Sequence, residues 1–164
     1  MNRNIALAAT ALSLGIALPG TATAQTAQQL VGTWTNVSNI NIRQDGSRVS
    51  VFGPNGKGLA IFDSNGRFAV VNINPDVPKF ASNNRAQGTP AENKAAMEAG
   101  IALFGTYAVG ADKVITMSVE GSTYPNWTGT DQKRTVLSFT GDELKWTLPA
   151  SIGGTAEVTW RRVK

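Results

Sequence analysis

Residues 114–120 read VITMSVE, and apolar and polar side chains alternate along them. Ile115, Met117 and Val119 therefore fall on one face of an extended chain, with polar side chains on the other. Residues 144–148 (LKWTL) repeat the pattern. Strict alternation is typical of a β-strand that buries one face and exposes the other to water. These two stretches therefore indicate an antiparallel β-protein.

Turn sequences separate similar stretches along the rest of the chain. Asp-Gly, Asn-Gly and Gly-Asp dipeptides, which favour tight turns, recur between runs rich in Val, Ile, Thr and aromatic residues. Short strands at such spacing predict an all-β barrel or sandwich. We place strands near residues 32–42, 48–52, 58–62, 67–73, 105–109, 114–120, 133–139, 144–148 and 155–163.

One segment departs from the alternation. Residues 89–92 (TPAE) form a capping box with proline at the first helical position. Met97, Ile101 and Phe104 then recur at helical spacing, and a glycine follows. We therefore predict one short α-helix over residues 90–104, whose apolar stripe lies against the β-structure.

The N-terminus is typical of a secretory signal peptide over residues 1–24. A basic residue precedes an Ala- and Leu-rich run over 5–18, and residues 22–24 (ATA) supply small side chains for cleavage. The apolar run is shorter than the roughly 20 residues of a membrane span. We therefore expect one barrel domain over residues 25–164, periplasmic or secreted, with no transmembrane segment after cleavage.

Composition excludes several kinds of chemistry. The chain contains no cysteine and no histidine, so disulfides, zinc–sulfur sites and Ser-His-Asp or Cys-His catalysis are absent. We predict no metal site and no cofactor. The 15 basic and 11 acidic residues give a net charge of +4, and the basic residues are scattered. Nucleic-acid binding needs a clustered basic face, so no nucleic-acid partner is expected.

The two ends of the domain carry complementary motifs. Gly32-Thr33-Trp34 opens the first predicted strand, and residues 160–162 (WRR) lie in the last. First and last strands are neighbours when a meander closes into a barrel. We therefore expect Trp34 to pack beneath Arg161 or Arg162, in a cation–π contact worth about 0.5–2 kcal/mol.

These end motifs resemble the lipocalin and fatty-acid-binding superfamily, and more of the chain resembles the bacterial lipocalin-like domain family. That resemblance implies an antiparallel lipocalin-like β-barrel that binds a small hydrophobic molecule, and it transfers no catalytic residues. The family pattern often has a histidine before Val-Glu-Gly, where this chain has Met117-Ser118, which argues against proton transfer there. The resemblance runs through residues 30–34 (LVGTW), 52–54, 57–58, 66–67, 88–90, 104–107 (FGTY), 119–122 (VEGS), 125–127 (PNW), 129–132 (GTDQ) and 160–162.

An aromatic and amide cluster at residues 124–127 is the candidate ligand site. Tyr124 and Trp127 can stack on a ligand that Asn126 orients. Alternatively, the segment is a structural corner in which Trp127 plugs the barrel end. We expect this loop, the predicted helix and the polar connection 74–88 to converge on one end and frame the cavity opening, although that connection is equally well explained as flexible.

Two carboxylates lie near this cluster in the sequence, Glu120 and Asp131, and Arg134 is a nearby cation. Buried together, the three would form a polar site with shifted pKa values. On the surface they would form ion pairs worth under about 1 kcal/mol. We assign Glu120 and Asp131 to the ligand site together with the three residues of the cluster.

Three functions are compatible with these patterns. The first is an extracytoplasmic binding protein for a small hydrophobic ligand, since an eight-stranded barrel is just wide enough to hold one. A cofactor-free isomerase or cyclase would use the same cavity to orient its substrate. A structural or interaction module would have a packed interior, with no cavity of about 300 Å³ or more.

Overall fold

Nine antiparallel strands follow one another in the computed structural model, which describes residues 27–164. The proposed signal peptide lies outside the described residues. The helical segments are α1 (Ala27–Leu30), α2 (Pro90–Glu98) and the 3-10 turn η1 (Pro125–Trp127). The strands are β1 (Gly32–Ile42), β2 (Arg48–Ser50), β3 (Lys57–Phe62), β4 (Arg67–Ile73), β5 (Gly100–Val109), β6 (Val114–Ser122), β7 (Asp131–Phe139), β8 (Glu143–Pro149) and β9 (Thr155–Arg162).

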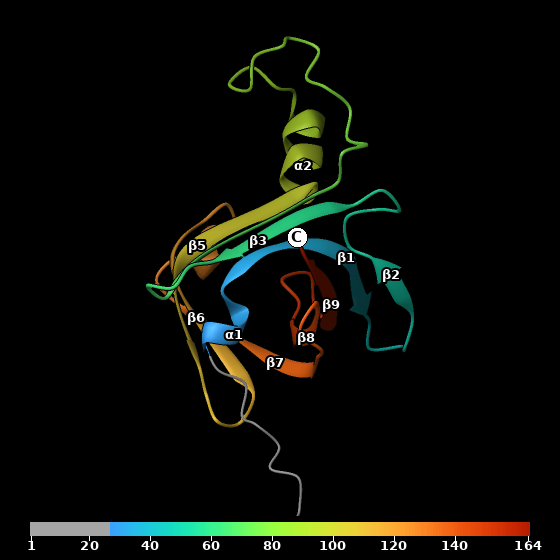
Figure 1. Ribbon diagram of the computed structural model, residues 1–164. Helices are drawn as coiled ribbons and strands as arrows, with labels where there is room; N and C mark the ends of the chain where they lie inside the picture. The colour runs from blue at the N-terminus through green and yellow to red at the C-terminus, as the bar shows by residue number, and fades with distance from the viewer. Residues whose placement is uncertain (1–26) are drawn as a thin grey trace, which may run out of the picture.

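Pairing of the last strand with the first closes the sheet into a barrel (Figure 1). The register of β1 and β9 runs from Trp34 opposite Arg162 to Ile42 opposite Thr155. Eight strands form the closed barrel, and β2 is an extra strand paired with the end of β1. The predicted closed antiparallel barrel with one short helix is therefore confirmed.

The alternation of apolar side chains sets the barrel interior. Ile115 and Met117 of β6 are fully buried, and Leu144 and Trp146 of β8 are at most 2% exposed. They join the inward-facing side chains of the other strands in one core. Every second residue thus points inward, as the sequence pattern predicts, and the core is the barrel lumen itself.

The helix α2 is shorter than predicted, and only its last turn reaches the barrel. It ends at Glu98, and Ile101 and Phe104 belong to β5, where they pair with Asn72 and Ala69 of β4. Hydrogen bonding of β5 to strands on both sides outweighs the weak helical periodicity of these residues. None of the α2 side chains is buried, and Met97 is 47% exposed. The helix and the connection before it project away from the barrel (Figure 1).

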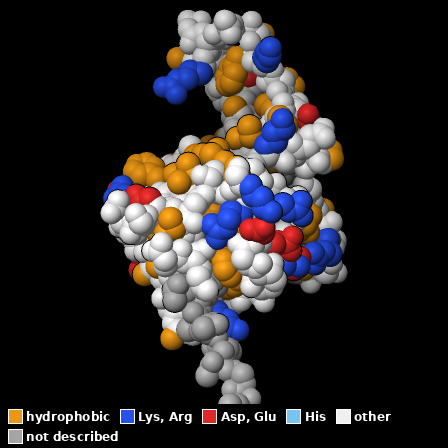
Figure 2. Space-filling model, in the orientation of Figure 1, with side chains coloured by type: hydrophobic (Ala, Val, Ile, Leu, Met, Phe, Trp, Pro, Cys, Tyr) orange, Lys and Arg blue, Asp and Glu red, His pale blue; other side chains and the backbone are white. Residues whose placement is uncertain are grey.

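A patch of hydrophobic side chains lies on the outer surface of the barrel. In Figure 2 it follows β5 towards the foot of α2. Each of its large members is between 41% and 50% exposed, and their strands are adjacent in the sheet. They are Leu59 and Ile61 of β3, Val71 and Ile73 of β4, and Phe104 of β5. The patch is on the opposite side of the sheet from the lumen.

Candidate ligand-binding site

The barrel has one end with tight turns and one end with longer loops, which we call the loop end. Because neighbouring strands are antiparallel, the connections after β1, β4, β6 and β8 all leave from the loop end. The connection 74–89, the helix α2 and the turn η1 are therefore at the same end. The tight turns after β3, β5 and β7 are at the other end, together with α1.

A cavity of about 60 Å³ lies in the lumen and extends towards the loop end. Its walls are inward-facing, mainly apolar side chains of the strands, among them Val70, Leu103, Met117, Trp146, Leu148 and Val158. Phe52, Ile101, Trp127 and Ile152 line it at the loop end. We call this space the inner cavity.

A second pocket of about 190 Å³ adjoins the inner cavity at the loop end. The two share Phe52, Ile101 and Ile152 as lining residues. Met97 and Glu98 from the last turn of α2 also line this outer pocket, together with Gly100 and Tyr124. The end of α2 and the 124–127 segment thus frame the opening, whereas the connection 74–88 lines neither space.

The aromatic residues of the candidate site lie at this opening. Trp127 is half-buried against the core and lines the inner cavity, and its ring meets that of Tyr124 edge to face at 5.8 Å. Thr130 Oγ1 donates to the carbonyl of Trp127 at 2.8 Å, which fixes the corner made by η1. Asn126 is exposed and lines neither space. Trp127 therefore sits where it can act both as a corner residue and as a ligand contact.

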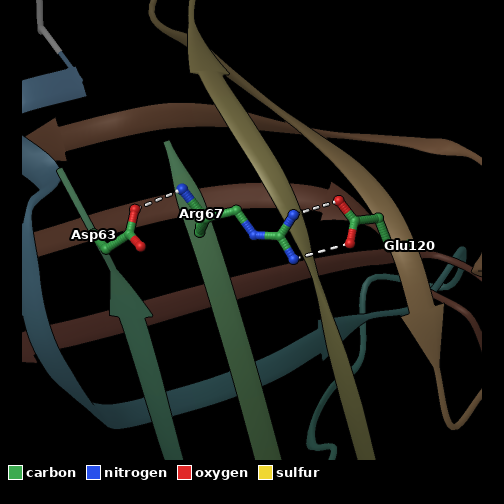
Figure 3. A network of polar contacts seen from close by, with 3 residues as sticks. All are labelled: Asp63, Arg67 and Glu120. Carbon is green, nitrogen blue, oxygen red and sulfur yellow. Dashed lines mark hydrogen bonds and ion pairs between the residues drawn. The ribbon is translucent and has the colours of Figure 1, made fainter. Parts of the chain in front are cut away.

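The structure does not bring Glu120 and Asp131 to the cavity. Glu120 lies on the outer surface, where both its oxygens accept from Arg67 at 2.6 and 2.9 Å (Figure 3). Asp63 holds the other end of that network by accepting from the Arg67 backbone N–H at 2.8 Å. Asp131 is exposed and accepts from Ser118 Oγ at 2.7 Å. The two carboxylates thus form surface contacts on the outside of the sheet.

Arg134 lies on the inner face of β7, because it is three positions after the outward-facing Asp131 and successive side chains of a strand point to opposite faces. It lines the inner cavity and is 4% exposed. Burial lowers the pKa of its guanidinium from 12.5 to about 10, so the group remains cationic at neutral pH. Its guanidinium carbon is 5.6 Å from the centre of the Trp127 ring. The alternation that places Val136 inward also places Arg134 inward, so the sequence pattern could have predicted this position.

The cavity wall contains further polar groups that sequence reasoning did not identify. The side-chain oxygens of Asn39 and Asn72 and the indole N–H of Trp160 are buried without a hydrogen-bond partner, and all three residues line the inner cavity. Asn72 alternates with Phe68 and Val70 in β4, so the strand pattern could have placed it inside. A mainly apolar wall with few polar groups is typical of small-molecule sites.

None of the helices within residues 27–164 is long and apolar enough to cross a membrane. Nor does this part of the chain contain a group of three or more acidic residues placed to hold a metal ion.

A closed eight-stranded antiparallel barrel with an apolar lumen open at one end defines a lipocalin-like protein. A family model described as a lipocalin-like domain matches residues 31–163. The chain therefore belongs to the lipocalin-like domain family. No curated protein matches it.

Similar solved structures are β-barrels. A redesigned β-barrel is 15% identical, with 88% of this chain and 100% of that chain covered and a TM-score of 0.45. A de novo designed fluorescence-activating β-barrel is 14% identical, with 84% and 96% covered and a TM-score of 0.41. A redesigned β-barrel bound to DFHBI is 17% identical, with 84% and 98% covered and a TM-score of 0.40.

Proposed function

We propose that this protein binds a small hydrophobic molecule in its barrel, outside the cytoplasm, in the periplasm or after secretion. The observation that carries the proposal is the inner cavity, which is mainly apolar, contains few polar groups and adjoins the outer pocket at the loop end. Small-molecule sites have this composition, and the mouths of β-barrels are among their usual places. The signal-peptide pattern of residues 1–24 supports the location.

The two volumes restrict the ligand. An apolar cavity of about 150 Å³ is known to accept a benzene ring, and the inner cavity is only about 60 Å³. A slender alkyl chain suits it better than a ring. Because the outer pocket adds about 190 Å³ at the opening, the ligand extends from the inner cavity to the loop end. We therefore propose a small, chain-like ligand.

The small inner cavity also favours a second candidate, an interaction module with a packed interior. Its volume of about 60 Å³ is below the roughly 300 Å³ that small-molecule pockets usually reach. In that case the barrel is a rigid support, and its partner contacts lie outside the lumen. Whether a molecule occupies the lumen of native protein separates the two candidates.

Extraction of the native protein tests the proposal. The full chain is expressed in a bacterial host, and the protein is recovered from the extracytoplasmic fraction. Native mass spectrometry and solvent extraction then identify any bound molecule. The intact mass also tests export, because cleavage between Ala24 and Gln25 leaves residues 25–164. A recovered protein that retains residues 1–18 contradicts the proposed location.

A matched pair of variants locates the bound molecule. Ala156 lines the inner cavity and is 6% exposed, so Ala156→Leu fills the space. Ala108→Leu makes the same change on the exposed outer face of β5. We expect the molecule with wild type and with Ala108→Leu, and its loss from Ala156→Leu. If all three proteins are folded and carry no molecule, the packed-interior candidate is favoured.

A further inference from the structure

The inner cavity contains a buried cation without an acidic partner. Arg134 is 4% exposed, and within residues 27–164 it forms no ion pair with any carboxylate. Asp131, the carboxylate nearest in sequence, and Glu120 are on the outer face and have partners there. A buried charge is costly unless it is paired, so natural proteins seldom retain one without compensation.

The guanidinium retains donors that the protein does not use. An arginine has five N–H donors in a planar fork, which matches the two oxygens of a carboxylate. Nη1 of Arg134 donates to the backbone carbonyl of Lys133 at 3.0 Å, and among the described residues Nε and Nη2 have no acceptor. Trp127 covers the group at 5.6 Å from its ring centre but accepts no in-plane hydrogen bond. The in-plane donors therefore remain available to a ligand.

The other polar groups of the wall add to this pattern. The indole N–H of Trp160 is a second buried donor without a partner. The unpaired side-chain oxygens of Asn39 and Asn72 are acceptors, which suit a hydroxyl group or an ordered water molecule. Arg134 is the one ionisable side chain among the residues that line the inner cavity. The net charge of this wall is thus positive.

We infer that Arg134 binds the carboxylate of the ligand, which is therefore a small amphiphilic acid with its slender apolar part in the lumen. This inference rests on the proposed function, since it requires a ligand in the barrel. A carboxylate would compensate the buried charge, and the apolar walls would exclude water from the pair. A neutral ligand of the same length would leave the guanidinium unpaired.

Two probes of equal chain length test this assignment, octanoate and octan-1-ol. Calorimetry measures their Kd values, and the emission of the cavity tryptophans Trp127, Trp146 and Trp160 places them in the lumen. Because hydrogen bonds to charged groups are strong, wild type should prefer octanoate by about 10- to 100-fold. Arg134→Gln should abolish this preference and change the Kd of octan-1-ol by less than about twofold.

Arg67→Gln is the matched control. It removes the same charge from the outer face, where Arg67 pairs with Glu120, and should keep the full preference for octanoate. If Arg134→Gln is not folded, Arg134→Lys serves instead, since it keeps the charge without the fork and should reduce the preference. Equal affinity of wild type for the two probes, or a preference for octanoate that survives in Arg134→Gln, overturns this inference but leaves the proposed function standing. If neither probe enters the wild-type lumen, the proposed function fails with it.

Discussion

The guanidinium carbon of Arg162 lies 4.1 Å from the centre of the Trp34 ring. Trp34 is fully buried, and its indole N–H donates to the carbonyl of Leu30 at 2.9 Å. Arg162 donates to the carbonyls of Val31 at 2.6 Å and Gln29 at 2.7 Å. The last strand is thereby fixed to the first strand and to α1, at the seam that closes the barrel. Sequence reasoning expected this contact, and the structure selects Arg162 over Arg161.

Trp34→Ala should destabilise the barrel severely. The substitution removes a fully buried aromatic ring, its hydrogen bond and the surface on which Arg162 packs. Such truncations cost about 3–5 kcal/mol in the free energy of unfolding. Urea unfolding followed by circular dichroism measures this. Val37→Ala, at a β1 position that is 48% exposed, is the control and should change little. A loss below about 1 kcal/mol at Trp34 would contradict a closing role for this ring.

The two adjacent arginines of β9 should differ strongly in their contribution to stability. Arg162 makes three hydrogen bonds to backbone carbonyls. The Arg161 side chain is 63% exposed and forms only an ion pair with Glu143 at 3.6 Å. Arg162→Met should cost about 2–4 kcal/mol, because bonds from a charged donor are lost. Arg161→Met should cost under about 0.5 kcal/mol. Similar losses from both variants in urea unfolding would contradict this difference.

Acid should weaken one network on the outside of the barrel. Glu157 of β9 accepts from Lys145 of β8 at 3.1 Å and from Arg48 of β2 at 2.9 Å, and these partners lower its pKa below the ordinary 4.5. With a depressed pKa in the folded state, its contribution is present above pH 4.5 and is lost as the pH falls through the folded-state pKa. Its partners Arg48 and Lys145 are 51% and 35% exposed, so water screens the pairs and the contribution is under about 1 kcal/mol.

Glu157→Gln measures this contribution directly. The variant should be less stable than wild type at pH 7, and the difference should be smaller at pH 2, because acid protonates Glu157 in the folded protein. Thermal unfolding at both pH values gives the comparison. Asp112→Asn, at an exposed turn position without an ion pair among the described residues, is the control. A difference that persists unchanged at low pH would show that the effect is not electrostatic.

The sequence predicted the barrel better than it predicted the site. Alternation along single strands placed Ile115 and Met117 inside, because burial of a strand face is a local property. The start of β5 was missed because Ile101 fits both a helical and a strand period, and only pairing with the distant Asn72 decides between them. The assignment of Glu120 to the ligand site was based on proximity along the chain, although its neighbour Val119 faces inward.

The size of the cavity could not be predicted from the sequence. It depends on how the side chains of several strands fill the lumen, and no local pattern encodes that packing. The same is true of the contact between Arg134 and Trp127, since η1 must fold over the opening before the two side chains meet. The alternation of β7 was sufficient to turn Arg134 inward, but it did not reveal that no carboxylate would accompany it.

Trp127→Ala should separate the two roles of the corner segment. The ring lines the inner cavity and is only half-buried, so its removal should weaken octanoate binding by about 1–3 kcal/mol with little change in Tm. Calorimetry and thermal unfolding of the same preparation give both quantities. Tyr124→Ala is the comparison, because Tyr124 lines the outer pocket but not the inner cavity. A large fall in Tm with unchanged affinity would assign Trp127 to the corner instead.

Arg134→Met should make the ligand-free protein more stable. Burial lowers the pKa of this base to about 10 in the folded state, so the fold disfavours its charged form at every pH below that value. Methionine fills the same lumen without a charge, and the variant should gain about 1–3 kcal/mol at pH 7 while losing the preference for octanoate. The cost to stability is then the consequence of retaining a cation for binding.

Urea unfolding of ligand-free protein at pH 7 checks this gain. The control is Arg67→Met, which removes an exposed cation from the outer surface and should change the stability by under about 1 kcal/mol. Saturating octanoate should then reverse the order, because the ligand stabilises wild type through Arg134 and has no such contact in Arg134→Met. If Arg134→Met is instead less stable than wild type without ligand, the guanidinium supports Trp127 at the barrel mouth, and its burial is explained by folding rather than by binding.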